Sequence, residues 1–212
     1  MLHLSVANPR ESVTGALVVN VTSQSSMPWA RELSPFFLGP VDLYDGMVAR
    51  NVENAWQYSK VYRQFLDRDG KLSTAYWDWA KAGWNKTRAD RYPMGKGAIP
   101  EFSYWNGNNL GYVDAREQVY CPLYAKSVVR TQAFQNLKNL VEKQAVTLID
   151  FDVYASGTKN LYAALKDPHR KFGHGFVLYG LLTGEIDLNG EFIRPEKHTR
   201  SLVQQKIAFE RD

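Results

Sequence analysis

The alternation of apolar and polar residues predicts a small sheet assembled from distant parts of the chain. Residues 2–6 alternate as a strand does, and residues 15–22 are rich in β-branched side chains. Residues 146–154 form the clearest strand pattern of the second half. Residues 33–44 are expected to form two extended pieces that turn at Asp45-Gly46. We therefore predict a sheet of the N-terminal strands and the 146–154 strand.

Helical patterns cover more of the chain than strand patterns. Residues 51–67 contain few helix breakers before Asp69-Gly70, and Asn51 is a suitable N-cap. Further helices are predicted at residues 73–84, at 112–143 with an interruption near Pro122, at 176–182 and in the charged tail from Glu196. No internal repeat or linker divides the sequence. The fold class that follows is α+β, a predominantly helical single domain over residues 1–212 with a small β-sheet.

The helix expected at residues 51–67 has two unlike faces. At 100° per residue, one face collects Val52, Ala55, Ser59, Tyr62, Phe65 and Leu66. The opposite face collects Glu53, Trp56, Gln57 and Lys60. A carboxylate, an amide, an amine and an indole on one face indicate the wall of a pocket. The alternatives are that the three polar residues form an ordinary solvated helix face and that Trp56 belongs to the core.

Residues 85–111 form a long stretch that is rich in Gly, Pro and Asn. Such a stretch inside a compact domain is either disordered or functional. Its large aromatic side chains argue against disorder. We expect a loop that lines or closes a site, with Tyr104 and Trp105 available to stack a base. Arg88, Arg91 and Lys96 would suit phosphate groups, although charges on loops are commonly only solvated.

The composition is rich in aromatic residues and has a small net charge. Aromatic residues make up 13% of the 212 residues, which suits a bulky core or a pocket that stacks flat rings. The net charge of +4 is too mild to argue for nucleic acid alone. The single cysteine, Cys121, precludes an internal disulfide and reads as a buried structural thiol. With no signal pattern and no long apolar run, we expect a cytoplasmic protein without a membrane partner.

The signatures of common cofactor and metal enzymes are missing. Gly95-Lys96-Gly97 is neither a P-loop nor a dinucleotide fingerprint, and Gly-x-Ser-x-Gly does not occur. One cysteine and four scattered histidines do not make a zinc motif. We expect no cofactor and no metal. Acid–base or amine chemistry remains as the main enzymatic option.

A tetrapeptide and a helix motif are shared with a known family. Residues 33–36 read Leu-Ser-Pro-Phe, and Glu53 stands eight residues after the Asp of Asp45-Gly46. The sequence then reads Glu-x-x-x-Gln-x-x-Lys through Gln57 and Lys60. This order resembles the NADAR family, the N-glycosidases named for NAD and ADP-ribose, whose tetrapeptide is similar to Phe-Ser-Asn-Phe.

The resemblance is close over residues 33–62 and weak elsewhere. Pro35 replaces the Asn of the family's tetrapeptide, and Asn54 stands where a His is usual. Residues 148–152, Leu-Ile-Asp-Phe-Asp, resemble the family's Leu-Val-Glu segment, which leads to a later Asp. Residues 85–111 have no counterpart.

The resemblance implies a NADAR-like fold and cleavage of the C1′–N bond between a ribose and a base or amine. The family's substrates are phosphorylated riboflavin-pathway intermediates and ADP-ribose attached to guanine. Glu53 would act as a base or stabilise the oxocarbenium ion, and the dipole of its helix would favour the ionised form. Lys60 could form a Schiff base with the opened sugar if burial lowers its pKa. Gln57 would contact ribose hydroxyls, and Trp56 would stack the base.

Four further residues complete the candidate site. Asp152 is a candidate catalytic residue, although its alternation with apolar neighbours also fits the wet face of a strand. Ser34 and Phe36, from the tetrapeptide, are candidates for substrate binding, with Ser34 alternatively bonding local backbone. His174 lies between two glycines and is either a ligand contact or a turn residue.

The expected partner is a small-molecule nucleotide or a nucleobase-linked ribose, free or within a modified nucleic acid, and the oligomeric state is open. Two alternatives remain. The same pocket could bind a nucleotide or a modified base without cutting it. The chain could instead be a nucleic-acid or protein-interaction factor, although no concentrated stripe of Lys and Arg supports this.

Overall fold

A three-stranded parallel sheet joins the start of the chain to its second half. Strand β8 (Val146–Ile149) lies between β1 (Leu4–Ala7) and β2 (Leu17–Asn20), and it runs parallel to both. The register pairs Val146 with Leu4 on one side and with Leu17 on the other. All four residues of β8 are buried, as expected for a central strand. The predicted sheet is confirmed, although the strand predicted at residues 146–154 ends at Ile149.

The structure, a computed structural model, describes residues 3–193. The tail from Glu196, predicted as a helix, lies outside the described residues. The α-helices are α1 (Pro28–Arg31), α2 (Val52–Gln57), α3 (Thr74–Trp84), α4 (Tyr112–Ala115), α5 (Cys121–Val128), α6 (Gln132–Lys143), α7 (Leu161–Lys166) and α8 (His174–Thr183). Two antiparallel sheets contain β3 (Val41–Asp42) with β4 (Val48–Ala49), and β5 (Lys60–Val61) with β6 (Phe102–Trp105) and β7 (Asn108–Leu110). Shorter helical turns are η1 (Arg63–Phe65), η2 (Arg116–Tyr120) and η3 (Ala155–Lys159).

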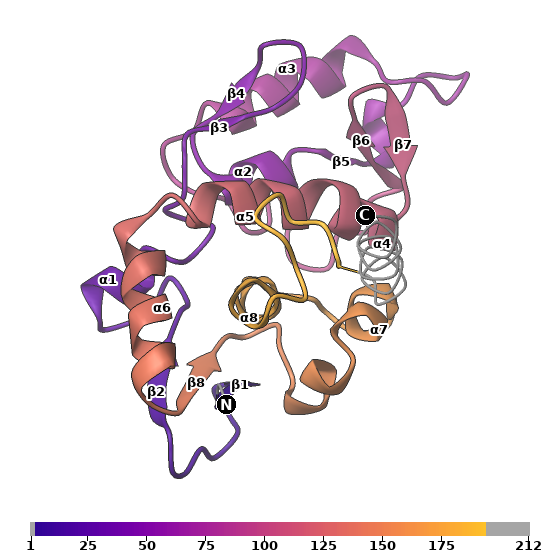
Figure 1. Cartoon of the computed structure of the whole chain (residues 1–212). Helices are drawn as coiled ribbons and strands as arrows, with labels where there is room; N and C mark the ends of the chain where they lie inside the picture. The colour runs from indigo at the N-terminus through magenta and orange to yellow at the C-terminus, as the bar shows by residue number, and fades with distance from the viewer. Residues whose placement is uncertain (1–2, 194–212) are drawn as a thin grey trace, which may run out of the picture.

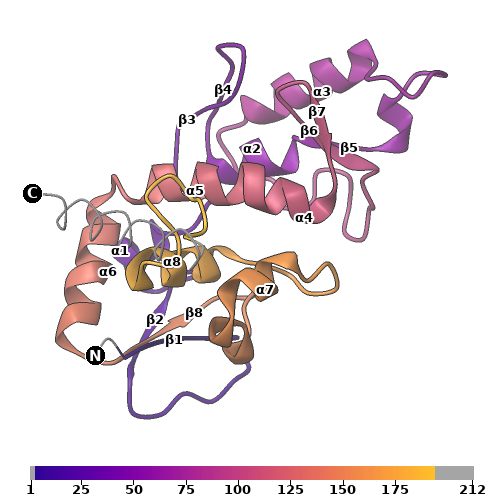
Figure 2. The ribbon, with the colours of Figure 1, turned by 45° about the vertical axis from the view of Figure 1, so that its right-hand side comes forward.

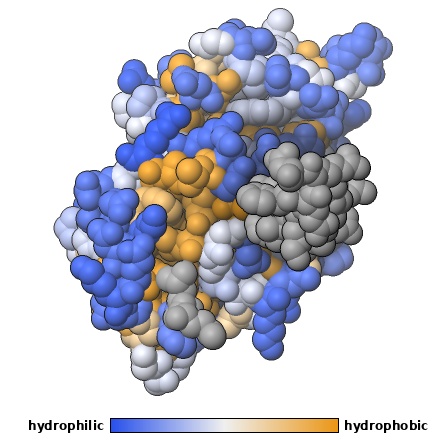
Figure 3. Space-filling view, in the orientation of Figure 1, coloured by the Kyte–Doolittle hydropathy of each residue, from blue (hydrophilic) through white to orange (hydrophobic). Residues whose placement is uncertain are grey.

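The elements form two halves on either side of the rod α4–η2–α5 (Figures 1 and 2). The parallel sheet lies in one half with α1, α6, α7 and α8, whereas α2, α3 and both antiparallel sheets lie in the other. One continuous apolar core extends through both halves. The chain is therefore a single α+β domain with small sheets, as the sequence predicts. Figure 3 shows apolar side chains gathered on one face, over α8 and the segment that follows it.

The helix predicted at residues 51–67 begins where expected but ends ten residues early. The Asn51 side chain accepts a hydrogen bond from the Asn54 N–H at 2.8 Å, so the predicted N-cap is confirmed. Helix α2 ends at Gln57, and Lys60–Val61 forms β5. Strand β5 pairs with β6, a strand from much later in the chain, and this long-range pairing overrides the local helical pattern.

Residues 33–37 form turns and residues 38–40 have no regular structure, so the extended piece predicted at residues 33–40 is wrong. The turns begin directly after α1, where the Ser34 N–H donates to the Arg31 carbonyl at 3.1 Å and the Phe37 N–H donates to the Ser34 carbonyl at 3.0 Å. The predicted turn at Asp45-Gly46 is confirmed. It connects β3 to β4, with positive φ angles of 52° and 71°.

The helical run predicted at residues 112–143 breaks at a different place from Pro122. The chain stays helical from α4 through the π-helical turn η2 into α5, in which Pro122 occupies the first turn. The Cys121 N–H donates to the Arg116 carbonyl, five residues back. The wider π turn gives the proline ring the room that an α-helical carbonyl would occupy. The break comes after Val128, and Thr131 caps α6 by accepting the Phe134 N–H at 3.1 Å.

The irregular stretch predicted at residues 85–111 is irregular only up to residue 101. Strands β6 and β7 form a hairpin whose turn, Asn106-Gly107, has positive φ angles of 46° and 84°. This Asn-Gly pair is a strong hairpin signal that the sequence prediction missed. The helix predicted at residues 73–84 is confirmed as α3. Over the described residues, no helix combines the length and the apolar character needed to cross a membrane.

Candidate functional site

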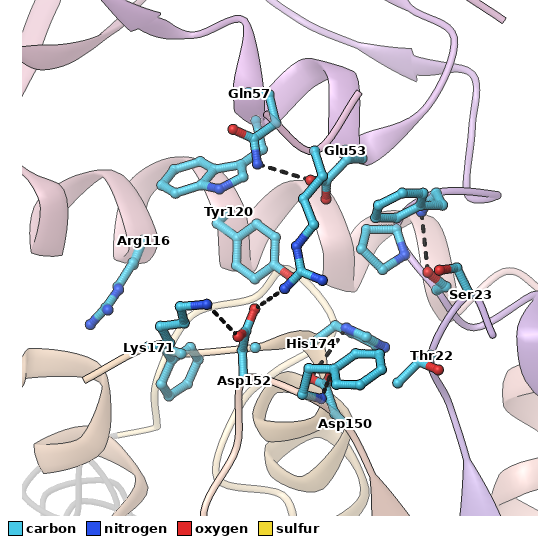
Figure 4. A pocket seen from close by; sticks show the side chains of 18 of the residues that line it. Thr22, Ser23, Glu53, Gln57, Arg116, Tyr120, Asp150, Asp152, Lys171 and His174 are labelled. Atoms are coloured by element: carbon cyan, nitrogen blue, oxygen red, sulfur yellow. Dashed lines mark hydrogen bonds and ion pairs between the residues drawn. The ribbon is translucent and has the colours of Figure 1, made fainter. Parts of the chain in front are cut away.

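One pocket lies where the two halves meet, and α2 forms its upper wall in Figure 4. The lower wall comes from the segment after β8 and from the start of α8. Most predicted site residues line the pocket, and those that do are Ser34, Phe36, Glu53, Trp56, Gln57, Lys60, Asp152 and His174. The cavity has a volume of about 170 Å³. Sites that enclose a whole drug-sized ligand have roughly 300–1,000 Å³, so this cavity has room for about one ring.

A buried chain of hydrogen bonds joins the three polar residues of the predicted motif. The Gln57 side-chain amide donates to Glu53 Oε1 at 2.9 Å, and Lys60 Nζ donates to Gln57 Oε1 at 2.6 Å. Glu53 and Gln57 are 5% and 7% exposed. The solvated helix face is therefore excluded. Lys60 reaches the chain from β5 rather than from the helix on which it was predicted.

Burial shifts the pKa values of the two ends of this chain toward their neutral forms. Burial raises the pKa of Glu53, against the hydrogen bond from Gln57 and the charge of Lys60. Burial lowers the pKa of Lys60 to about 8, against the charge of Glu53. The helix dipole was expected to hold Glu53 ionised, but desolvation outweighs it. An amine with a pKa of about 8 is neutral in roughly a tenth of molecules at pH 7, which makes it a usable nucleophile.

Trp56 belongs both to the pocket wall and to the core. Its side chain is 9% exposed and lines the cavity. Lys60 Nζ lies 5.0 Å from the centre of the Trp56 ring, within the range of a cation–π interaction. The Tyr120 ring packs on Trp56 with centroids 5.3 Å apart. The indole therefore holds the Lys60 ammonium group beside Gln57 and leaves little of its own surface for stacking a base.

Asp152, a predicted catalytic residue, bridges two cations on the opposite wall. Its carboxylate accepts from Arg91 at 2.8 Å and pairs with Lys171 Nζ at 3.1 Å. Arg91 comes from the irregular loop, so this ion pair joins that loop to the segment after β8 across the pocket. About a quarter of the Asp152 side chain is exposed. The positive charges of Arg91 and Lys171 therefore hold the Asp152 carboxylate at the mouth of the pocket.

His174 is fixed by contacts at the end of the parallel sheet. Its Nδ1 lies 3.3 Å from Asp150 Oδ2, and its Nε2 lies 2.9 Å from the Val21 carbonyl. Asp150 also accepts the Gly175 N–H at 3.0 Å. A Cβ at Gly173 would lie 2.2 Å from Asp150 Oδ2, which explains the glycine before His174. Both nitrogens of the buried ring have partners, so His174 connects the segments that follow β2 and β8 at the pocket.

Two predicted substrate contacts lie elsewhere. Tyr104 and Trp105 are on β6, and their rings pack on Tyr44 with centroids 5.8 and 5.1 Å apart. They do not line the pocket, because pairing of β6 with β5 directs them into an aromatic cluster with α3 residues such as Trp77. The substrate contact predicted for Tyr104 and Trp105 is therefore not available from the wall of this pocket. Ser34 does face the cavity, and its Oγ also accepts the Phe36 N–H at 3.4 Å.

Exposed aromatic rings surround the mouth of the pocket, and the sequence did not single them out as a group. Tyr92, Tyr112 and Phe151 are 46%, 48% and 39% exposed, and all three line the pocket. They come from three separate segments, so no local pattern connects them. The guanidinium group of Arg91 lies between two of them, 5.6 Å from the Tyr92 ring and 5.9 Å from the Phe151 ring.

The loop that carries Arg91 is anchored by Asn54, the neighbour of Glu53 on α2. The Asn54 side chain donates to the carbonyls of Lys86 and Arg88 at 2.9 and 3.2 Å, and it accepts the Asp90 N–H at 2.9 Å. Asn54 is fully buried. Helix α2 therefore presents Glu53 to the cavity and, one residue on, fixes the loop that covers it.

The described part of the chain holds no cluster of three or more His, Cys, Asp or Glu side chains suited to a metal ion. Cys121 is buried and burial raises its pKa, as expected for a structural thiol. A family model described as "Family of unknown function (DUF6939)" matches residues 3–166. The match includes Glu53, Lys60 and Asp152 and ends before His174. A comparison with curated proteins finds no match.

Proposed function

The chain belongs to the family of unknown function DUF6939, and we propose that its pocket is the active site of an N-glycosidase with NADAR-like chemistry. The proposed reaction cleaves the C1′–N bond of a ribosylated nucleobase or of an ADP-ribose-like nucleotide. The observation that carries this proposal is the buried Glu53–Gln57–Lys60 chain at the wall of a small cavity. Such a chain supplies a carboxylate and an amine to the same reacting atom.

Glu53 suits the part of a base and cation stabiliser. Cleavage of a glycosidic bond builds positive charge on C1′, and a carboxylate beside it lowers the barrier. Burial raises the pKa of Glu53, which makes it a stronger proton acceptor than a surface carboxylate. Gln57 holds the Glu53 carboxylate in one orientation and leaves its second oxygen for the substrate or water.

Lys60 suits the part of the nucleophile. Its neutral amine attacks C1′, the C1′–N bond breaks, and the bond's electron pair leaves with the base, which takes up a proton. Glu53 accepts the proton that the amine loses and passes it to the departing base. The sugar then opens to a Schiff base between C1′ and Nζ, and water hydrolyses this intermediate to free the sugar. The lowered pKa of Lys60, about 8, provides the neutral amine that the first step requires.

The charge and rings of the pocket fit a nucleotide. Four cationic side chains line it, Lys60, Arg91, Arg116 and Lys171, against three carboxylates, Glu53, Asp150 and Asp152. An anionic ligand would balance this excess. A cavity of about 170 Å³ accommodates the ribose, and the exposed rings at the mouth provide surfaces on which a base can stack.

Base release is the direct test of the proposed function. The protein is incubated with NAD, ADP-ribose, ribosylated riboflavin precursors and ADP-ribosylated guanine, and free base is measured by liquid chromatography. We expect release from at least one compound, with a loss of 100-fold or more in Glu53→Gln, roughly the contribution of a general base. Glu101→Gln changes an exposed carboxylate in the same way and should keep full activity.

Equal release by Glu53→Gln and the parent protein would overturn the mechanism. Tight binding of a compound without its turnover would instead favour a nucleotide-binding module that uses the same pocket. The folded state of each variant is checked by its melting temperature.

A further inference from the structure

Tyr120 is a buried residue whose hydroxyl opens onto the pocket and has no hydrogen-bond partner among the described residues. The residue is 6% exposed and lines the cavity from the turn η2. Figure 4 shows its ring between Glu53 on one wall and Asp152 and His174 on the other. Within residues 3–193, its hydroxyl makes no hydrogen bond to the protein. A hydroxyl at the end of a buried side chain that opens only onto a cavity is free to bond a ligand held there.

The neighbouring Tyr124 shows what a structural tyrosine does on the same helical rod. It stands one turn further on, with its ring stacked beside that of Tyr120 at 6.3 Å. The Tyr124 hydroxyl donates to the Leu33 carbonyl at 2.6 Å, and the residue is absent from the pocket lining. A phenylalanine would fill the space of Tyr120 as well as tyrosine does. The hydroxyl is therefore explained by the pocket and not by packing.

The surroundings of the Tyr120 hydroxyl determine what it can bind. Glu53, Asp150 and Asp152 all act on it electrostatically, and together with burial they raise its pKa well above the ordinary value. The hydroxyl therefore stays protonated and acts as a donor. An anionic oxygen at this point would be repelled by the three carboxylates. A neutral sugar hydroxyl fits, because it can accept from Tyr120 while it donates to a carboxylate.

We propose that the Tyr120 hydroxyl donates a hydrogen bond to a hydroxyl group of the substrate's ribose, in a sugar subsite enclosed by the carboxylates of both walls. The identity of the sugar rests on the proposed function, whereas the need for a neutral acceptor rests on the pocket alone. The charged groups of the ligand then lie nearer the mouth, where Arg91 and Lys171 are found.

Binding and stability of matched variants test this subsite. The affinities of ADP-ribose and ribose 5-phosphate are measured by calorimetry for the parent protein, Tyr120→Phe and Tyr124→Phe. We expect Tyr120→Phe to bind both probes roughly tenfold more weakly or worse. Its melting temperature should stay equal or rise, because the change removes a cavity-facing hydroxyl that makes no hydrogen bond to the described residues. Tyr124→Phe should show the reverse: unchanged affinity and a lower melting temperature.

Deoxygenated probes identify the partner of the tyrosine. The 2-deoxy and 3-deoxy forms of ribose 5-phosphate each lack one hydroxyl. The probe that lacks the contacted hydroxyl should bind the parent protein and Tyr120→Phe equally, whereas the other should keep the tenfold difference.

Two results would overturn the subsite alone: undiminished binding of both probes by Tyr120→Phe, or a fall in its melting temperature as large as that of Tyr124→Phe. Failure of the parent protein to bind either probe would overturn the sugar subsite together with the proposed function.

Discussion

Burial gives Lys60 and Glu53 chemical properties that neither side chain has on a protein surface. Desolvation lowers the pKa of Lys60 to about 8 and raises that of Glu53, although each charge partly stabilises the other. Glu53 and Lys60 are linked through Gln57 rather than by a direct ion pair. The attraction between two such buried charges seldom offsets the free energy lost in removing both from water. The position of this pair at a cavity indicates that it is retained for chemistry. The protein should therefore be more stable without it.

The double variant Lys60→Met/Glu53→Gln should stabilise the protein at pH 7, because it removes both buried charges, whereas either change alone would leave the other charge without its partner. The folded pKa of about 8 lies below the unfolded value near 10.4, so the unfolded state binds more protons between these values and the free energy of unfolding rises with pH there. Below pH 8 the destabilisation by the buried ammonium group is fully present. Removing it together with the Glu53 charge should raise the free energy of unfolding by about 1–2 kcal/mol at pH 7, and by less at pH 10.

Urea unfolding at the two pH values measures this difference, with Lys81→Met as the control. Lys81 is exposed on α3, and its loss should change little. A double variant that is less stable than the parent protein at pH 7 would mean that Gln57 and Trp56 compensate the buried charges fully.

The role of the Asp152 charge can be tested separately from Glu53 and Lys60, because its carboxylate pairs with two other cations, Arg91 and Lys171. In Asp152→Asn, Arg91 and Lys171 lose their shared carboxylate while the side chain keeps its shape. An anionic ligand then no longer competes with Asp152 for the two cations. We expect ADP-ribose to bind several-fold more tightly, with a steeper dependence on salt. Calorimetry at two salt concentrations checks this, and Asp78→Asn, an exposed change on α3, is the control. Weaker binding would assign Asp152 a direct contact with the ligand.

At the scale of elements, the sequence correctly predicts that Glu53, Gln57 and Lys60 lie together, but it predicts only one of the two elements that carry them. Glu53 and Gln57 lie one helical turn apart on α2, as the periodicity indicated. Lys60 meets Gln57 from a strand instead, because β5 pairs with β6 about forty residues later. Local sequence contains no signal for that pairing. The N-cap role of Asn51 could be predicted from the sequence, because capping depends only on neighbouring residues.

Asn54 links α2 to the loop of residues 86–101, and this link predicts a local effect. Asn54→Ala removes three buried hydrogen bonds and leaves loop carbonyls and one N–H without partners. We expect a loss of roughly 2–4 kcal/mol in the free energy of unfolding. Trypsin should also cleave after Arg88 and Arg91 well before the rest of the chain.

Asn85→Ala is the matched control. The Asn85 side chain donates to one carbonyl, that of Lys81, at an exposed site. Its loss should leave both stability and the cleavage pattern nearly unchanged. Equal effects of the two substitutions would show that Asn54 does not hold the loop.

At the scale of the whole molecule, the site lies at the carboxyl end of the parallel sheet. Asp150 follows β8 and Thr22 follows β2, at the edge where α/β proteins commonly bind ligands. The sequence predicted these strands but not their shared direction. It could not show that Tyr120 would enter the pocket, because that depends on how the rod α4–η2–α5 lies between the halves. Tyr104 and Trp105 lie away from the pocket for a different reason, because β6, on which they stand, pairs with β5.

Trapping of a covalent intermediate tests the central claim most directly. The protein is incubated with a substrate that it cleaves, reduced with borohydride and digested, and the peptides are examined by mass spectrometry. We expect a sugar-derived mass on Lys60, lost in Lys60→Arg and retained in Lys171→Arg, which changes another amine of the same pocket. Turnover without an adduct on Lys60, or an adduct on Lys171 instead, would contradict the account.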